Sequence, residues 1–304
     1  MKRLSFIVPV YNRPDEVKEL LQSMASQSCR DFEEILLVED GSTVPCEEVA
    51  RSYAEQLPIS YYRIPNGGPG GARNYGAARA KGEYLIVLDS DCLLPPDYVR
   101  EVQAALAETG ADAFGGPDRA SKDFTPIQKA INYAMTSFFT TGGIRGGKKK
   151  LDKFYPRSFN MGIRSEVYHS LNGFSAMRFG EDIDFSIRLY AAGCKVCLFP
   201  GAWVYHKRRT GWKKFFRQVY NSGIARINLF KKYPSSLKAV HLLPAVFTLG
   251  VALCLLVSCF WPYALTPLLL YALLVFFDAA RKEKSLRIGG LAVVASYIQL
   301  LGYG

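Results

Sequence analysis

The sequence predicts an α/β domain built on a parallel sheet, followed by helices that cross a membrane. Short apolar runs of strand length alternate with amphipathic helical segments in the first third of the chain. Several of these runs end in polar or glycine-rich turns, as strands do at the ligand-binding edge of an α/β sheet. A long apolar tract follows a strongly basic segment near the end of the chain.

Four apolar runs predict the first strands: 4–8, 34–38, 59–64 and 84–88. The helices between them follow from apolar side chains at helical spacing, such as Val17, Leu20, Leu21 and Met24. The first helix is predicted to have Asn12 as its N-cap, and the second to run to about Gln56. Because strands alternate with helices, the crossovers are right-handed and the strands parallel.

The remaining elements are less regular, with helices over about 96–108, from Gly180 and over 211–232, and strands over 158–163 and 202–206. Between them the segment Thr140–Lys150 mixes glycines with lysines. It reads equally as a solvated loop and as a lid or phosphate-binding loop for an acceptor.

The run 84–88 ends in Asp89-Ser90-Asp91. Two carboxylates one residue apart at a strand end form an oxygen site suited to Mg²⁺ or Mn²⁺ with a diphosphate, although a turn alone also uses aspartates there. The glycine-rich segment 66–71 offers backbone N–H groups and a helix start to a phosphate. It matches neither a Walker A loop nor a dinucleotide fingerprint, which disfavours a dehydrogenase.

Two further features can be interpreted as either structural or functional. Asp182 and Asp184 lie roughly 200° apart on one helix, so only one faces a given cleft. Asp184 reads as a surface pair with Arg188, and Asp182 as a helix cap or as a base kept anionic by the helix dipole. His206, alone at a strand end, is more often a structural residue than a ligand.

The charge of +11 is uneven, with a net of −1 for residues 1–206 and +12 for 207–304. A basic block that adjoins an apolar tract favours anionic lipid headgroups over nucleic acid. The tract 240–277 is too long for one crossing, and Phe260-Trp-Pro-Tyr263 with Pro267 divides it into two helices. Residues 288–304 fit an interfacial helix, a third span or a span cut short.

The seven cysteines have no framework spacing. Cys194 and Cys197 have metal-ligand spacing but lie in an apolar run, which favours core positions. We therefore expect the cysteines to be reduced and the chain to face the cytosol.

Seven short segments occur in the order found in family 2 glycosyltransferases: Pro9-Val-Tyr-Asn12, Val38-Glu-Asp-Gly-Ser42, Gly70-Gly-Ala-Arg-Asn74, Leu88-Asp-Ser-Asp91, Phe159-Asn-Met-Gly162, Gly173-Phe174 and Glu181-Asp182. The chain resembles that family over roughly residues 4 to 230. The resemblance implies a GT-A-type fold, a Rossmann-like mixed sheet flanked by helices. It also implies an inverting transfer of a sugar from a nucleotide sugar.

By this resemblance, the donor nucleotide is held by Pro9, Tyr11, Asn12, Asp40, Arg73, Asp89 and Ser90. A Mn²⁺ or Mg²⁺ ion is held by Asp91, Asp89 and His206, which is similar to a third metal ligand in some GT-A enzymes. Asp182 is the implied base, and Glu181, Asn160 and Gly162 belong to the acceptor side. Asp40 suits the edge of uracil, which favours a UDP-sugar.

The sequence departs from the family pattern at Glu39, where an aspartate is common, and at Gln218, which is not followed by the Arg-Trp of processive synthases. The second departure favours the addition of one sugar per encounter. The expected organisation is a catalytic domain over 1–206, a basic interfacial segment over 207–239 and a membrane domain over 240–304, with a hairpin of about 240–259 and 261–278.

The expected enzyme is a multi-pass protein of a bacterial-type inner membrane with its catalytic domain in the cytoplasm. It would use a nucleotide sugar and a lipid-linked or other membrane-associated acceptor, with a polyprenyl-linked glycan favoured, in cell-surface polysaccharide synthesis. The alternatives are a polyprenyl-phosphate sugar synthase, whose acceptor is a phosphate, and a non-catalytic scaffold that binds nucleotide sugars at the membrane.

Overall fold

The computed structural model describes residues 1–119, 124–142, 154–208 and 210–304. They form two compact units. The first, here the sheet unit, contains Met1–Ser121 and Phe154–Lys207. The second, here the helical unit, contains Lys122–Lys153 and Arg208–Gly304.

Within the described residues, the sheet unit contains a mixed seven-stranded sheet in the order β3-β2-β1-β4-β8-β6-β9. Strands β1 to β4 are parallel, whereas β8 runs antiparallel to β4 and β6. The strands are β1 (Leu4–Val10), β2 (Glu34–Asp40), β3 (Ile59–Ile64), β4 (Tyr84–Leu88), β6 (Ala113–Gly115), β8 (Asn160–Arg164) and β9 (Val196–Leu198).

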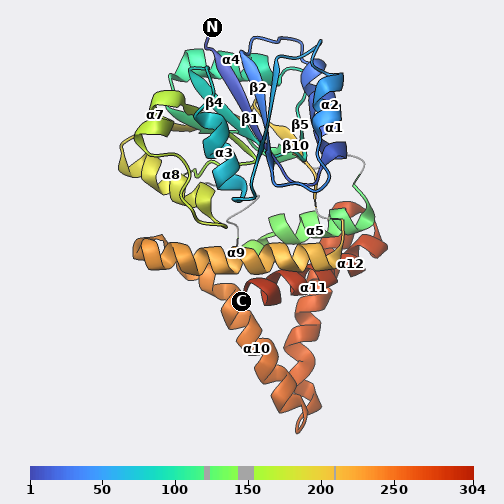
Figure 1. The fold of residues 1–304 in the computed structure, drawn as a ribbon. Coiled ribbons are helices and arrows are strands. Elements are labelled where there is room, and N and C mark those ends of the chain that lie inside the picture. The colour runs from blue at the N-terminus through green and yellow to red at the C-terminus, as the bar shows by residue number, and fades with distance from the viewer. Residues whose placement is uncertain (120–123, 143–153, 209) are drawn as a thin grey trace. The chain divides into compact units, whose positions relative to one another are not determined.

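Helices cover both faces of this sheet (Figure 1). Alternation along β1 explains why, because Phe6 and Val8 point into one core and Ile7 into the other. The first core contains side chains of α1 (Pro14–Ala25), α2 (Glu47–Ser52) and α4 (Tyr98–Thr109). The second contains side chains of α3 (Pro69–Ala77), α7 (Ser165–Ser170) and α8 (Glu181–Ala191).

The register brings the carboxyl ends of β1, β2 and β4 to one edge. Pro9 pairs with Val38 on β2, and Ile7 pairs with Val87 on β4. The strand order runs from β1 to β2 and β3 on one side and to β4 on the other, so β1 and β4 flank a topological switch point, where ligands bind in such sheets.

A second, smaller sheet lies beyond this edge of the main sheet. It contains β5 (Cys92–Leu93), β10 (Val204–His206) and β7 (Asp118–Arg119) in the order β5-β10-β7. Strand β10 runs antiparallel to β5, with His206 paired to Cys92. This pairing brings the end of the sheet unit beside the residue that follows Asp91.

The helical unit has a core of its own, which includes Ala130, Phe215, Val275 and Ala292. Helices α10 and α11 form a hairpin in Figure 1. The α-helices are α5 (Pro126–Thr136), α6 (Phe138–Thr141), α9 (Trp212–Lys232), α10 (Leu243–Ser258), α11 (Thr266–Glu283) and α12 (Leu286–Tyr303), joined by the 3-10 turns η1 (Pro234–Ser236), η2 (Ala239–Leu242) and η3 (Pro262–Leu265).

Three helical segments among the described residues are long and apolar enough to cross a membrane: Ala239–Ser258, Pro262–Glu283 and Leu286–Tyr303. Their mean hydropathies are 2.4, 1.7 and 1.3. The third is the most enclosed by protein, because α12 packs on α5, α9 and α11.

The predicted order of strands and helices is confirmed, with two local differences. The second helix ends at Ser52 instead of Gln56. Asn12 is not the N-cap of α1, because Arg13 occupies that position and Asn12 has a φ of 54°. The predicted basic loop Thr140–Lys150 lies outside the described residues from position 143 onward.

Candidate active site

The ends of β1 and β2 are tied together by Asn12. Its backbone N–H donates to Ser42 Oγ at 2.8 Å, and its Oδ1 accepts from the backbone N–H groups of Thr43 at 2.8 Å and Val44 at 2.9 Å. These bonds explain the left-handed backbone of Asn12, a conformation that asparagine tolerates. Beside it Tyr11 is 52% exposed, so its ring is open to a ligand at the strand end.

The end of β2 holds Asp40 in a closed turn. Its side chain is buried, and Oδ1 accepts from the backbone N–H of Gly67 at 2.7 Å. Asn66 donates from Nδ2 to the backbone carbonyl of Asp40 at 2.8 Å. Gly41 is required between them, since its φ is +71° and a Cβ would lie 2.7 Å from the backbone nitrogen of Asn66.

The aspartates after β4 have different partners. Asp89 is half-buried, and its Oδ1 accepts from Nη2 of Arg73 at 2.9 Å. Ser90 and Asp91 are buried. Asp91 Oδ2 accepts from Nη1 of Arg13 at 2.6 Å, and Asp91 Oδ1 lies 3.2 Å from Nε2 of His206.

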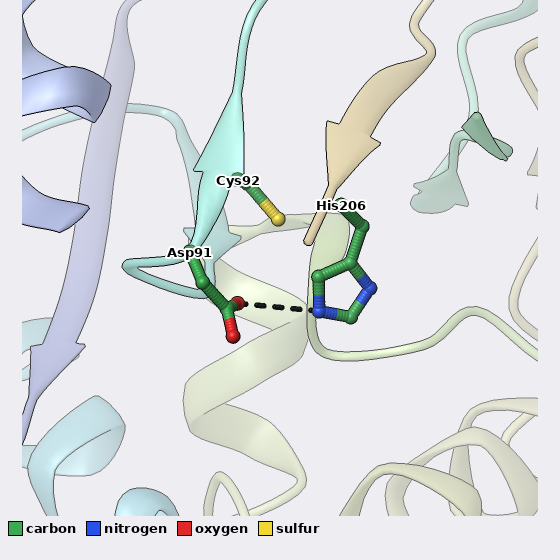
Figure 2. Close-up of side chains that lie close together, drawn as sticks. All are labelled: Asp91, Cys92 and His206. Carbon is green, nitrogen blue, oxygen red and sulfur yellow. Dashed lines mark ion pairs between the residues drawn. The ribbon is translucent and has the colours of Figure 1, made fainter. Parts of the chain in front are cut away.

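Asp91, Cys92 and His206 each place a potential ligand atom within 4.8 Å of the others (Figure 2). Burial, then the nearby Asp89 and Asp91, raises the pKa of the Cys92 thiol well above its ordinary value. Its Sγ donates to the Phe159 carbonyl at 3.4 Å, and sulfur is a softer ligand than Mn²⁺ and Mg²⁺ prefer. The carboxylate and imidazole left in the cluster suit Mn²⁺ or Mg²⁺.

His206 is fixed in orientation as a ligand must be. Its ring stacks on Phe159 with centroids 4.9 Å apart, and its Nδ1 is buried without a hydrogen-bond partner among the described residues. The donor set therefore fits a divalent ion held by Asp91 and His206, with Asp89 nearby on the same turn.

Arg73 connects the strand end to α8. It is buried and donates from Nη1 to Glu181 Oε1 at 2.7 Å as well as from Nη2 to Asp89. Burial raises the pKa of Glu181 above its ordinary value of 4.5, although Arg73 acts in the opposite direction. Asp182, the next residue, is also buried, and its Oδ2 lies 2.7 Å from Nε of Arg157.

The structure thus brings together most of the residues that the sequence singles out. Arg73 and Glu181 are linked to the turn after β4 through the Arg73 ion pairs, and Asp182 follows Glu181 in α8. The other residues lie at or beside the strand ends: Tyr11, Asn12, Asp40, Asp89, Ser90, Asp91 and His206. Pro9 lies inside β1, where it pairs with Val38.

Two positions expected on the acceptor side lie in the core instead. Asn160 is fully buried, and its amide is used by Tyr98, which donates to Oδ1, and by the Ala202 carbonyl, which accepts from Nδ2. Gly162 faces the ring of Phe114, which a Cβ would meet at 2.0 Å. Both residues therefore have packing roles, and their place on the acceptor side stays a prediction.

The interpretation of Asp184 as half of a surface pair is wrong. Its carboxylate is completely buried and accepts from Nε of Arg188 at 3.0 Å, while Arg188 also donates to the carbonyls of Leu171 and Gly173. Asp184 therefore fixes the loop before α8 through Arg188, and Asp182 is left as the carboxylate beside Glu181.

Sequence reasoning missed Arg13, Arg157 and Cys92. The two arginines are the partners of Asp91 and Asp182, and a signal for them existed, because a buried carboxylate needs a nearby cation. Arg13 follows the first strand directly, as Asp91 follows the fourth. Arg157 precedes Asn160 by three residues, and no local pattern links it to Asp182.

Comparison with known proteins places this site in a family. The sequence model described as glycosyl transferase family 2 matches residues 5–171, more than half of the chain. The chain belongs to this family. The match includes the turns that follow β1, β2 and β4, whereas Glu181, Asp182 and His206 of this family 2 glycosyltransferase lie beyond it.

The chain spans only part of the length of the curated relatives that it matches. An uncharacterized glycosyltransferase of Rickettsia conorii is 38% identical over 106 residues, which cover 35% of this chain and 17% of that protein. The family 2 assignment therefore concerns the shared domain.

Two solved structures show the fold of this family 2 glycosyltransferase. The mannosyltransferase PcManGT from Pyrobaculum calidifontis, in complex with GDP-Man and Mn²⁺, superposes with a TM-score of 0.69 over 97% of this chain and 87% of that one, at 18% identity. Staphylococcus aureus TarS in complex with UDP has a TM-score of 0.53 over 74% and 66% of the two chains, at 21% identity. The expected GT-A-type fold, with apolar C-terminal helices, is confirmed.

Proposed function

We propose that this glycosyltransferase moves a sugar from a UDP-sugar to a hydroxyl group of a membrane-associated acceptor, in an inverting reaction that depends on Mn²⁺ or Mg²⁺. The observation that carries the proposal is the cluster of Asp91 and His206 at the end of β4, beside the switch point of the sheet. Asp89, two positions before Asp91, would supply a further oxygen ligand.

The donor nucleoside fits between the ends of β1 and β2. Asp40 already accepts one hydrogen bond from Gly67, and a carboxylate has further lone pairs for the N3–H of a uracil. The exposed ring of Tyr11 offers a face on which a base can stack. Asn12 fixes the two loops that carry these groups, which keeps the base site in shape before the donor arrives.

The diphosphate belongs beside Asp89 and Asp91. A divalent ion bound there neutralises the charge that develops on the departing nucleoside diphosphate. Arg73 stabilises this part of the site, because its guanidinium lies 2.9 Å from Asp89 and 2.7 Å from Glu181 and holds both carboxylates in place. Such preorganised charges act without rearranging during the reaction.

Asp182 is the proposed base for the acceptor hydroxyl. It lies in the first turn of α8 next to Glu181, and Arg157 fixes the position of its Oδ2. A carboxylate that removes the proton while the hydroxyl oxygen attacks from the face opposite the diphosphate gives inversion without a covalent intermediate.

One observation also supports a phosphate acceptor. The side chain of Arg157 is 39% exposed while it pairs with Asp182, and arginine binds phosphates well. A polyprenyl-phosphate acceptor carries its own negative oxygen and needs no base. The alternative enzyme, a polyprenyl-phosphate sugar synthase, therefore uses the same donor site.

We further propose that the helical unit anchors the enzyme in a bacterial-type inner membrane, with the sheet unit in the cytoplasm. Three helices meet the length and hydropathy of spans. Helix α9 presents an exposed apolar stripe, formed by Phe216, Tyr220, Ile224, Ile227 and Phe230, together with six lysines and arginines. Such a helix suits an anionic bilayer surface, where a lipid-linked acceptor in cell-surface polysaccharide synthesis is found.

The test is the release of UDP from UDP-sugars by the purified full chain with Mn²⁺. We expect release with one UDP-sugar and a lipid-linked acceptor, and its loss by about 100-fold or more in Asp91→Asn, because the metal loses an anionic ligand. Arg51→Gln, which breaks an ion pair on the surface of α2, is the control. Unchanged turnover in Asp91→Asn would overturn the proposal.

A further inference from the structure

Arg13 is a partly exposed cation in direct contact with the proposed metal ligand Asp91. Its Nη1 lies 2.6 Å from Asp91 Oδ2, and its side chain is 32% exposed while that of Asp91 is 6% exposed. A second carboxylate, Glu16, lies 3.9 Å from the same nitrogen. The contact crosses the switch point, from the end of β1 to the end of β4.

A buried carboxylate such as Asp91 requires a countercharge. Four carboxylates lie around the proposed metal and acceptor positions, and each is paired with an arginine: Asp91 with Arg13, Asp89 and Glu181 with Arg73, and Asp182 with Arg157. Before the donor and the ion bind, these arginines neutralise the negative charge of the carboxylates. An ion can neutralise the same charge.

A divalent ion on Asp91 competes with Arg13. Both are cations, and both use the oxygens of the same buried carboxylate. When the ion binds alone, it loses hydration water, and Asp91 loses its short charge-assisted hydrogen bond with Arg13. Both changes weaken the binding of the ion.

Of the arginines at the strand ends, Arg13 is the one that can exchange. Arg73 is 3% exposed and is held by two carboxylates, whereas the guanidinium of Arg13 reaches solvent. A diphosphate placed next to Asp91 offers Arg13 a new bidentate partner a short distance away. The donor diphosphate therefore replaces the Asp91 carboxylate, which Arg13 loses when the ion binds.

We propose that Arg13 is an exchange residue, which holds Asp91 while the site is empty of ligand and transfers to the donor diphosphate when the ion takes its place. This inference rests on the proposed donor and metal site. Its consequence is coupling: the ion binds weakly alone and tightly with the nucleotide, and the nucleotide binds more tightly with the ion by the same factor.

The test measures Mn²⁺ binding to the full chain in detergent by electron paramagnetic resonance, with and without UDP. For the unmodified chain we expect UDP to tighten Mn²⁺ binding by tenfold or more. For Arg13→Gln we expect Mn²⁺ alone to bind on the order of tenfold more tightly, because the competitor is gone, and the effect of UDP to shrink.

Two further variants separate this role from a loss of charge or of structure. Arg13→Lys keeps the competing cation and should bind Mn²⁺ alone as weakly as the unmodified chain. Arg51→Gln removes a surface arginine with an ion pair of the same length, 2.6 Å, and should leave both affinities unchanged. If Arg13→Gln does not fold, nitrogen-15 NMR of the Arg13 side chain replaces it, with the diamagnetic ion Mg²⁺, and its signal must shift when Mg²⁺ and UDP are added together.

The failures are distinct. If Mn²⁺ binds to the unmodified chain but Arg13→Gln leaves its affinity and its coupling to UDP unchanged, or if the Arg13 signal does not respond to the two ligands, the exchange role is overturned and the metal site stands. If the unmodified chain binds no Mn²⁺ even with UDP, the metal-dependent function itself is overturned.

Discussion

At the scale of single residues, the proposed site is a set of carboxylates whose positions are fixed by arginines. Arg73 holds Asp89 and Glu181, and Arg157 holds Asp182. Asp182 is therefore a carboxylate with a fixed position in the first turn of α8, next to Glu181. For this reason we assign it the role of base.

This assignment predicts the effect of Asp182→Asn. The amide cannot accept the proton of a hydroxyl acceptor, so turnover should fall by about 100-fold to 10,000-fold. Donor binding, measured by UDP titration, should stay unchanged. Full activity in this variant would reject Asp182 as the base and favour a phosphate acceptor.

Glu181 gives a prediction for pH. Its folded pKa is raised by burial, so the folded chain binds this proton more tightly than the unfolded chain does, and stability is lost as pH rises from 4.5 through the raised value. Glu181→Gln cannot titrate. The melting temperature of the unmodified chain minus that of Glu181→Gln should therefore decrease between pH 4 and pH 7. A difference that increases with pH would contradict this direction.

At the scale of elements, β8 needs a glycine for packing. Gly162 sits between β4 and β6, and the Phe114 ring occupies the space where its side chain would lie. Phe114 in turn stacks on Phe199 at 4.4 Å, so it has little freedom to move.

We therefore expect Gly162→Ala to destabilise the sheet unit by about 1–3 kcal/mol, because a methyl group forces the aromatic pair apart. Gly71→Ala is the matched control, since a Cβ at Gly71 has nothing within 4 Å and alanine favours a helix. Chemical denaturation measures both. Equal stability of the two variants would show that the Phe114 ring can move aside.

The elements differ in how far the sequence predicts them. The first strands are short apolar runs with polar ends, so their order and their shared edge follow from local patterns. The small sheet does not, because β5, β7 and β10 are two or three residues long, and β10 pairs with β5 across more than a hundred positions and with β7 across 86. For this reason His206 could be linked to Asp91 only through the family resemblance, and the contacts of Arg13 and Arg157 required the structure.

At the scale of the whole molecule, the chain combines two units with different surfaces. The sheet unit buries its apolar side chains in two cores, whereas α10 and α11 expose theirs. A soluble unit rarely exposes so many large apolar side chains. This contrast, together with the basic residues of α9, is the physical basis for the proposed membrane anchor.

The proposed topology can be checked at a natural cysteine. Cys259 is exposed and follows α10 directly, so a hairpin that enters from the cytoplasm places it on the opposite side of the membrane. In intact spheroplasts a maleimide that cannot cross the membrane should label the full chain and should not label Cys259→Ser. Labelling that requires permeabilised cells would place the turn on the cytoplasmic side.

The central claim is that a divalent ion at Asp91 takes part in binding the nucleoside diphosphate. The most direct measurement is anomalous X-ray scattering from crystals of the full chain grown with Mn²⁺ and UDP. We predict an anomalous peak at coordination distance, about 2.1 Å, from oxygens of Asp91 and of the UDP diphosphate. A peak elsewhere, or UDP bound away from Asp91, would contradict the account.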